Sequence, residues 1–366
     1  MVGTSQRRVG VAAVMRQEGP YVLDWVAWHR LLGFETLIAD NGGTDSQSEI
    51  LQRLHACGHI VRLDFRAITR KPQVPAYNAL IRTALRLGID YLGFLDADEF
   101  FEPLSETSWQ GAGARTVADA FAASKSVTVA FNWMCFGDSM LPAPAIAPVT
   151  ERFTWAARQN SELNLAFKSF CDVTGACQIL DSLPGSRLHP HGVELHPRNC
   201  WHDGGPLRIG RGFGGSAEVS WKTARIRHYV IKTFPEFQSG KVLRGGGDKS
   251  RFEARYDRAF FDAHNRNELN APLPAEIMEL LKASMMRLSA EIEVTKVPTK
   301  GLAGINLQPW RLAWLARDFW ARGWRHQFDK TPRLLAHATY EAAKLKLKMW
   351  FCFWNITVKS LSLKSI

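Results

Sequence analysis

The first hundred residues alternate short apolar runs with helical patterns, and this alternation most constrains the fold. Strand-like runs lie at 9–15, 36–40, 59–63 and 91–95, with helix-like segments between them. Such alternation is typical of a mostly parallel sheet with helices on its faces. We therefore predict an α/β fold in which polar groups gather at the carboxyl ends of the strands, where ligands bind in open α/β sheets.

The helical segments of this region carry recognisable end signals. Pro20 suits a first helical position, and Gly33 marks the end of the same helix. Ser46 and Glu49 form a capping-box pattern for a helix through residue 56. Beyond residue 100 the pattern is less regular. Further expected elements are a helix at 76–87, a strand at 127–131, and helices at 254–263 and 276–292.

Positive charge is concentrated in the C-terminal part of the chain. The 366 residues carry a net charge of +11; residues 296–366 hold 13 basic and 3 acidic side chains, whereas residues 1–295 hold 33 and 32. Four tryptophans of this region fall on one side at helical spacing: Trp310, Trp314, Trp320 and Trp324. We predict two regions, an α/β body at 1–295 and a basic amphipathic helical tail at 296–366.

The predicted tail has the composition of a segment that lies on a membrane surface. Tryptophan and arginine suit the headgroup boundary, and basic side chains are attracted to anionic lipid; packing on the body or in a dimer is the alternative. No uncharged apolar stretch approaches the ~20 residues of a spanning helix. Six scattered cysteines favour a reducing compartment. We expect a cytoplasmic protein, peripheral on the inner face of the membrane, with no nucleic acid as partner.

The sharpest chemical signal is the stretch Phe94–Phe100, an apolar strand that runs directly into three carboxylates. Asp96 and Asp98 can turn toward one hard divalent cation, Mn²⁺ or Mg²⁺, which would neutralise charge on a diphosphate. A solvated acidic turn is the alternative for a bare aspartate pair. The position of the pair, at the end of the fourth expected strand, favours the ligand-binding interpretation.

A second element is the segment that follows the second expected strand. Asp40 can accept a hydrogen bond from a base or ribose, and Gly42 with Gly43 lets the backbone pass close to a ligand. A plain strand-to-helix turn with Asp45 as its cap is the alternative. Combined with the aspartate pair, this segment predicts a nucleotide pocket.

Residues 17–45 and 95–101 resemble family 2 GT-A glycosyltransferases, and more narrowly the branch with a D-x-D-E-F motif that is related to family 92. Further similar residues occur in the same order: Trp25, His29, Gln73, Tyr77, Trp133, Phe136, Gly137, Arg227, His228, Tyr229, Lys232, Phe237, Lys241, Arg244, Gly245 and Asn265–Glu268. The resemblance implies a GT-A fold, a nucleoside-diphosphate-sugar donor, Mn²⁺ or Mg²⁺ at Asp96 and Asp98, and Asp40 near the base. One departure is Arg16-Gln17-Glu18, where the family usually has lysine, asparagine and glutamate.

The expected site follows from these patterns and from the resemblance. His191 or His228 is the candidate third metal ligand. Asp138 is the candidate base for the acceptor hydroxyl, with Glu99 and Asp203 as competitors. Residues expected to contact the donor are Arg16, Glu18, Asp40, Asn41, Asp45, Lys71, Gln73, Lys232, Lys241 and Arg244.

The favoured function is metal-dependent transfer of a sugar, from a UDP-sugar as the expected donor, to a glycan or lipid-linked glycan acceptor in cell-surface polysaccharide assembly. Inversion is what the resemblance suggests. A non-catalytic, membrane-associated glycan-binding or scaffold protein is the main alternative. A haloacid-dehalogenase-like phosphotransferase is disfavoured because its aspartate pair follows the first strand. A Rossmann dehydrogenase is disfavoured because no G-x-G-x-x-G follows the first strand.

Overall fold

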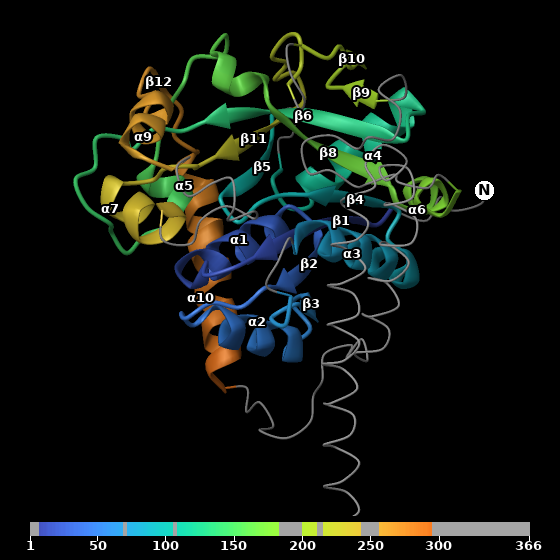
Figure 1. Cartoon of the computed structure of the whole chain (residues 1–366), viewed down its shortest axis with the longest axis horizontal. Coiled ribbons are helices and arrows are strands. Elements are labelled where there is room, and N and C mark those ends of the chain that lie inside the picture. The colour runs from blue at the N-terminus through green and yellow to red at the C-terminus, as the bar shows by residue number, and fades with distance from the viewer. Residues whose placement is uncertain are drawn as a thin grey trace, which may run out of the picture. The chain divides into compact units, whose positions relative to one another are not determined.

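A ten-stranded sheet forms the centre of the described part of the chain (Figure 1). The computed structural model describes residues 7–68, 72–104, 108–182, 200–210, 215–242 and 256–294. Its arrangement, a curled sheet flanked by helices, confirms the predicted α/β class and is consistent with a Rossmann-like GT-A fold.

The first half of the sheet is parallel, as the alternation predicts. Its strands, in spatial order, are β4 (Tyr91–Phe94), β1 (Val9–Met15), β2 (Glu35–Asp40) and β3 (Val61–Asp64). The connecting helices are α1 (Gly19–Leu31), α2 (Gln47–Ala56) and α3 (Gln73–Leu87). The predicted capping box is wrong, because the Ser46 side chain makes no cap hydrogen bond. Instead, Asp45 accepts the backbone N–H of Gln47 at 3.2 Å.

The second half of the sheet is mixed, and the sequence patterns did not predict it. Its strands are β8 (Phe167–Asp172), β6 (Thr128–Cys135), β9 (Cys200–His202) and β10 (Gly205–Pro206). The antiparallel strand β8 lies between β4 and β6. A branch is formed by β5 (Glu99–Pro103) and β11 (Ala224–His228), where β11 pairs with both β5 and β6.

The described residues contain further helices and strands. They are α4 (Ala112–Ser124), α5 (Val149–Arg152), β7 (Trp155–Ala156), η1 (Glu162–Leu165), α6 (Val173–Ser182), α7 (Phe234–Phe237), η3 (Gln238–Val242), α9 (Arg258–His264), β12 (Leu269–Asn270) and α10 (Ala275–Val294). The strand expected at 127–131 and the helices expected at 254–263 and 276–292 correspond to β6, α9 and α10.

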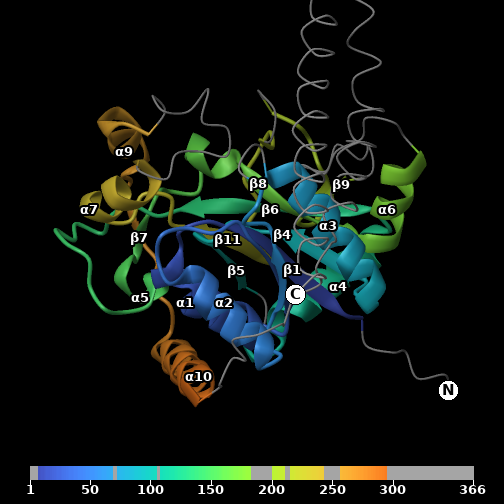
Figure 2. The ribbon, with the colours of Figure 1, turned by 60° about the horizontal axis from the view of Figure 1, so that its bottom comes forward.

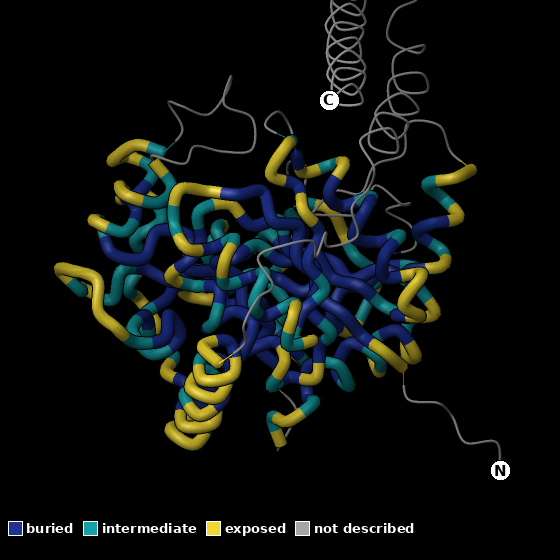
Figure 3. Tube along the Cα trace, turned by 90° about the horizontal axis from the view of Figure 1, so that it is seen from below, coloured by how far each residue is buried: buried dark blue, intermediate teal, exposed yellow. Residues whose placement is uncertain are grey.

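Two apolar cores cover the two faces of the sheet. In β1, Val11 and Ala13 belong to one core and Ala12 to the other, as the two-residue period of a strand requires. Helices α1, α2, α4 and α10 contribute to the first core, and α3 and α6 to the second. Figure 2 shows α1 and α2 side by side, and Figure 3 shows the buried positions concentrated in the interior.

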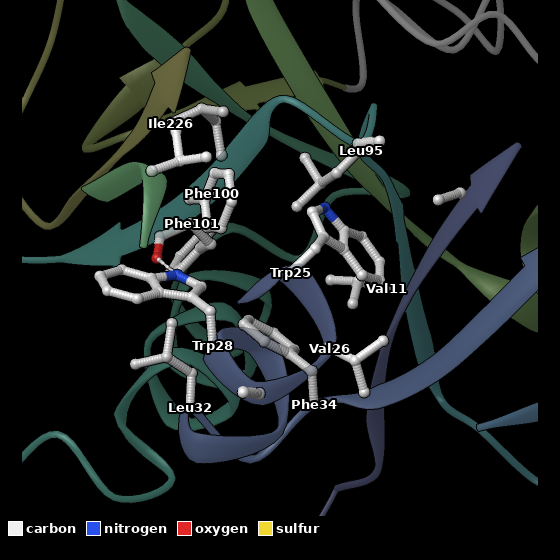
Figure 4. Close-up of a cluster of buried hydrophobic side chains, with 14 of the residues drawn as sticks. Val11, Trp25, Val26, Trp28, Leu32, Phe34, Leu95, Phe100, Phe101 and Ile226 are labelled. Atoms are coloured by element: carbon white, nitrogen blue, oxygen red, sulfur yellow. Dashed lines mark hydrogen bonds between the residues drawn. The ribbon is translucent and has the colours of Figure 1, made fainter. Parts of the chain in front are cut away.

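Two tryptophans of α1 join this helix to the strand that carries the acidic residues (Figure 4). Trp25 and Trp28 are fully buried. Trp28 Nε1 donates to the carbonyl of Phe101 at 2.7 Å, and its ring meets Phe100 edge-on. Burying such a side chain contributes about 3 kcal/mol. The second half of α1 is thereby held against β5.

The chain divides into two units, Met1–Asn306 and Leu307–Ile366. The predicted tail at 296–366 lies outside the described residues, so its association with a membrane stays a prediction. Among the described helices, none combines the length and the apolar character needed to cross a membrane.

Candidate functional site

The acidic turn, Asp96–Glu99, connects β4 to β5. The backbone N–H of Glu99 donates to the carbonyl of Asp96 at 3.0 Å, and the Glu99 carboxylate accepts the backbone N–H of Asp96 at 2.9 Å. From α1, Trp25 Nε1 donates to the carbonyls of both residues at 3.1 and 3.0 Å. The turn is therefore fixed by its own atoms and by the core.

Lys168 reaches the acidic turn from β8. Because β8 runs antiparallel to β4, with Phe170 opposite Gly93, continuing the register carries Lys168 to the residues that follow β4. Its ammonium lies 2.9 Å from Asp96 Oδ2 and 3.1 Å from Glu99 Oε2. The Lys168 side chain is fully buried, whereas that of Asp96 is 42% exposed. One side of Asp96 is thus held by a cation while the residue remains open to solvent.

Strand β11 and the segment after it supply the groups around Asp98. Tyr229 donates its backbone N–H to the carbonyl of Asp98 at 2.9 Å. His228 Nε2 lies 3.8 Å from Asp98 Oδ1 and 3.9 Å from Glu99 Oε1. Lys241, in η3, places its ammonium 2.7 Å from Asp98 Oδ2. The Asp98 side chain is only 4% exposed, so these neighbours cover it.

Lys232 also lies in this region, in an uncommon backbone conformation. The residue is buried, has a φ of 56°, and places its ammonium 4.3 Å from the ring centroid of Tyr21. Strained conformations of non-glycine residues persist where the surrounding structure determines them, often at functional sites.

Taken with the contacts above, the structure brings the predicted residues Asp96, Asp98, His228 and Lys241 together.

Burial and neighbouring charges set the protonation of the acidic turn. Burial raises the pKa of Glu99 to about 8; Lys168 opposes the rise, and Asp96 and Asp98 add to it. Burial also disfavours the charged form of Asp98, yet Lys241, the strongest of its cationic neighbours, lowers the pKa of Asp98 below its ordinary value. Glu99 therefore binds a proton more readily than Asp98 does.

Burial and neighbouring charges also set the protonation of His228 and Lys168, two basic neighbours of the turn. Burial lowers the pKa of His228 to about 3, although Asp98 opposes this, so the imidazole is neutral at neutral pH. Burial also acts to lower the pKa of Lys168, but Asp96 and Glu99 raise it above its ordinary value, and the side chain stays an ammonium. The turn thus faces the buried ammonium of Lys168 and the neutral ring nitrogen of His228, in addition to the ammonium of Lys241.

Several predicted donor-binding residues meet in two adjoining loops, after β1 and after β2. Gln17 donates its N–H to the carbonyl of Gly42 at 3.1 Å, and Gly19 donates to Asp45 Oδ2 at 2.7 Å. Arg16 is exposed on the first loop, and Glu18 is buried beside it. The loops after β1 and β2 therefore form one continuous surface at the carboxyl edge of the parallel strands.

Asp40 is saturated by protein partners. Arg62 Nε and Nη2 donate to its Oδ2 at 3.0 and 2.6 Å. Its Oδ1 accepts from Gly42 N, Gln47 Nε2 and Ser48 Oγ at 3.0, 2.9 and 3.0 Å. The next residue, Asn41, donates to the carbonyls of Phe65 and Ile68. The structure gives both side chains a role in shaping the loop, and their contact with a nucleotide stays a prediction.

The carboxylates predicted to serve as base are also held by the protein. Asp138 accepts from the backbone N–H of Met140 and from the amides of Asn267 and Asn265, at 2.8, 3.0 and 2.9 Å. Asp203 accepts from the backbone of Lys222 and Thr223. Glu99 is fully buried. The identity of the base stays a prediction.

The remaining predicted residues fall in two groups. Gln73 is exposed at the start of α3. Lys71, His191 and Arg244 lie outside the described residues.

The donor groups at the acidic turn fit a hard divalent cation. Asp96 and Asp98 offer carboxylate oxygens, the preferred ligands of Mg²⁺ and Mn²⁺, and the neutral imidazole of His228 is a further ligand. The buried atoms Asp98 Oδ2 and Glu99 Oε1 accept no directed hydrogen bond. Over the described ranges, no three His, Cys, Asp or Glu side chains stand in a ready-made metal arrangement. The chemistry fits, while Lys241 holds Asp98 in the present conformation.

Sequence reasoning missed Lys168, although the chain carries a signal for it. Lys168 stands among Phe167, Ser169, Phe170 and Cys171, and these five residues of β8 are all buried. A lysine at such a position is almost never fully buried without a paired acid. The signal predicts a buried ion pair but does not identify the partner.

Comparisons with known proteins add little to this geometry. No family model matches the chain, and no curated protein matches it. TarS from S. aureus is similar over 48% of this chain and 30% of its own, with 12% identity and a TM-score of 0.30. Mannose-1-phosphate geranyltransferase from Thermus thermophilus is similar over 49% of this chain and 54% of its own, with 14% identity and a TM-score of 0.25. The chain thus spans 30% and 54% of the length of these two proteins, and the likeness is too slight to support a function.

Proposed function

We propose that the chain is a glycosyltransferase that takes a sugar from a nucleoside-diphosphate donor, with UDP-sugar as the favoured donor. One observation carries the proposal: the acidic turn at the carboxyl edge of a parallel sheet, surrounded by Lys168, Lys241 and His228. Open α/β sheets bind ligands at this edge. The D-x-D-E-F resemblance supports the same assignment.

The residues of the site divide the work of binding and charge neutralisation. Asp96, Asp98 and His228 would hold a divalent cation, which supplies electrostatic stabilisation to a departing diphosphate. Lys232 and Lys241 would pair with phosphate oxygens, acting by position and charge. The surface formed by the loops after β1 and β2 would receive the nucleoside. The acceptor is proposed to be a glycan or a lipid-linked glycan.

Calorimetric titration with UDP and GDP, with and without Mn²⁺, tests the proposal. The test variant is Asp96→Asn with Asp98→Asn, and the control is Asp181→Asn, an exposed aspartate paired with Arg82. We expect metal-dependent nucleotide binding that weakens on the order of 100-fold in the double variant. The control should bind as the unaltered protein does. A correctly folded protein that binds neither nucleotide under any condition would contradict the proposal and favour the scaffold alternative.

A further inference from the structure

Asp98 differs from Asp96 in being covered by a lysine that can move away. Asp98 is 4% exposed, and Lys241 contacts its Oδ2 at 2.7 Å. At this distance the contact is an ion pair that covers the Asp98 carboxylate. A cation that is to bind Asp98 must therefore take the place of the Lys241 ammonium.

The two lysines at the turn are not equally free to leave. Lys168 is fully buried on the central strand β8 and contacts two carboxylates at once. Lys241 is 17% exposed on the short element η3, where its ammonium contacts Asp98. That ammonium stands on a flexible four-carbon stem with rotatable donors. Lys241 is the partner of the acidic turn that can exchange.

The charge of the turn points to what would draw Lys241 away. Lys168 and Lys241 contact the carboxylates of the turn, and the charge of Lys232 also acts on Asp98. A divalent cation added to this arrangement meets a nearby ammonium of like charge, which opposes binding. A diphosphate offers that ammonium new oxygen partners of the kind that lysine binds well.

We propose that Lys241 is a placeholder at the metal site, which transfers its ammonium from Asp98 to the donor diphosphate as the cation takes Asp98. The inference rests on the proposed function and adds to it a coupling between the two ligands. Cation and nucleotide bind weakly alone and strongly together, because each removes the obstacle to the other. Such a coupling is reciprocal by thermodynamic necessity.

The test compares Lys241→Met with the unaltered protein in two binding measurements. Free Mn²⁺ is followed by electron paramagnetic resonance without nucleotide, and UDP binding is followed by calorimetry with saturating Mn²⁺. We expect Lys241→Met to bind Mn²⁺ alone on the order of tenfold more tightly, and UDP on the order of tenfold more weakly. A merely structural role for Lys241 would weaken both, since it would disturb the whole site.

Two further variants show which group is responsible. Lys232→Met removes a nearby positive charge that acts on Asp98 more weakly than Lys241 does, so its gain in Mn²⁺ affinity should be clearly smaller. Adding Asp98→Asn to Lys241→Met should abolish the gain. Unchanged or weaker Mn²⁺ binding by Lys241→Met would overturn the placeholder role while leaving the proposed function intact. Absence of UDP binding by the unaltered protein would overturn both.

Discussion

Asp40, the last residue of β2, and Asp96, two residues after β4, lie at the carboxyl ends of parallel strands, and the protein surrounds them differently. Asp40 is fully buried and accepts hydrogen bonds on both oxygens, with Arg62 only 6% exposed beside it. Asp96, after β4, shares Lys168 with Glu99 and remains 42% exposed. The first carboxylate is fully used within the fold, whereas the second keeps an open side. An aspartate at a strand end thus stays accessible to a ligand only where the fold leaves its side chain partly exposed.

The largest expected effect concerns Asp40, whose carboxylate is saturated by protein partners. Arg62→Met removes the charged partner of Asp40 and leaves a buried carboxylate uncompensated, so we expect the free energy of unfolding to fall by about 4 kcal/mol. Urea denaturation at neutral pH measures the loss. Nucleotide affinity of the folded fraction should stay the same. If Arg62→Met loses nucleotide binding while its stability is unchanged, Asp40 belongs to the ligand site and the contrast between the two ends fails.

Lys168→Met is the matched change beside Asp96, and we expect it to lower the free energy of unfolding by less. The same buried-pair argument applies, but Asp96 is 42% exposed, and Glu99, whose pKa burial raises to about 8, holds a proton at neutral pH. We expect a loss of about 3 kcal/mol in the free energy of unfolding. Adding Glu99→Gln replaces a neutral carboxyl with a neutral amide and should change the stability little further. If the double variant is clearly more stable than Lys168→Met, Glu99 carries a charge that Lys168 neutralises, and the protonated state of Glu99 is wrong.

Much of the parallel half could be predicted from the sequence, because its signals are local. Val9–Met15 forms β1 as its apolar run indicates, and the helix ended by Gly33 lies where Pro20 and the periodicity place it. The position of the acidic turn at a strand end followed from the same patterns. Helices and strands of this half depend on neighbours within a few residues, and those can be read directly from the chain.

The surroundings of the acidic turn could not be predicted, because they depend on distant pairings. Lys168 bonds to Asp96 across 72 positions in the sequence, through an antiparallel strand that breaks the expected alternation. His228 reaches the turn only because β11 pairs with β5. Asp40 has local partners in Gly42, Gln47 and Ser48, but its charged partner Arg62 comes from β3, as the lysine that pairs with Asp96 comes from β8.

Glu99 should make the stability of the protein depend on pH. Burial raises the pKa of Glu99 to about 8 from an ordinary value of 4.5. Between these values the folded protein keeps a proton that the unfolded chain has released, so the free energy of unfolding falls as pH rises. The value of about 8 already includes the opposing effect of Lys168, and we expect a fall of about 3 kcal/mol between pH 5 and pH 8, relative to Glu99→Gln. Urea midpoints at several pH values measure it, and parallel curves for the two proteins would contradict the assignment.

The smallest expected effect tests whether Trp25 positions the acidic turn, as distinct from stabilising the core. Trp25→Phe removes the indole N–H that serves the carbonyls of Asp96 and Glu99, and Trp28→Phe removes the N–H that serves Phe101. Each change should cost about 1 kcal/mol for the lost hydrogen bond, in addition to a packing loss that the two variants share. Only Trp25→Phe loosens the turn, so it alone should weaken Mn²⁺-dependent UDP binding, by a few fold. Calorimetry on both variants gives the comparison. If both variants weaken UDP binding equally, the site responds to a general loss of core stability, and Trp25 does not position the turn separately.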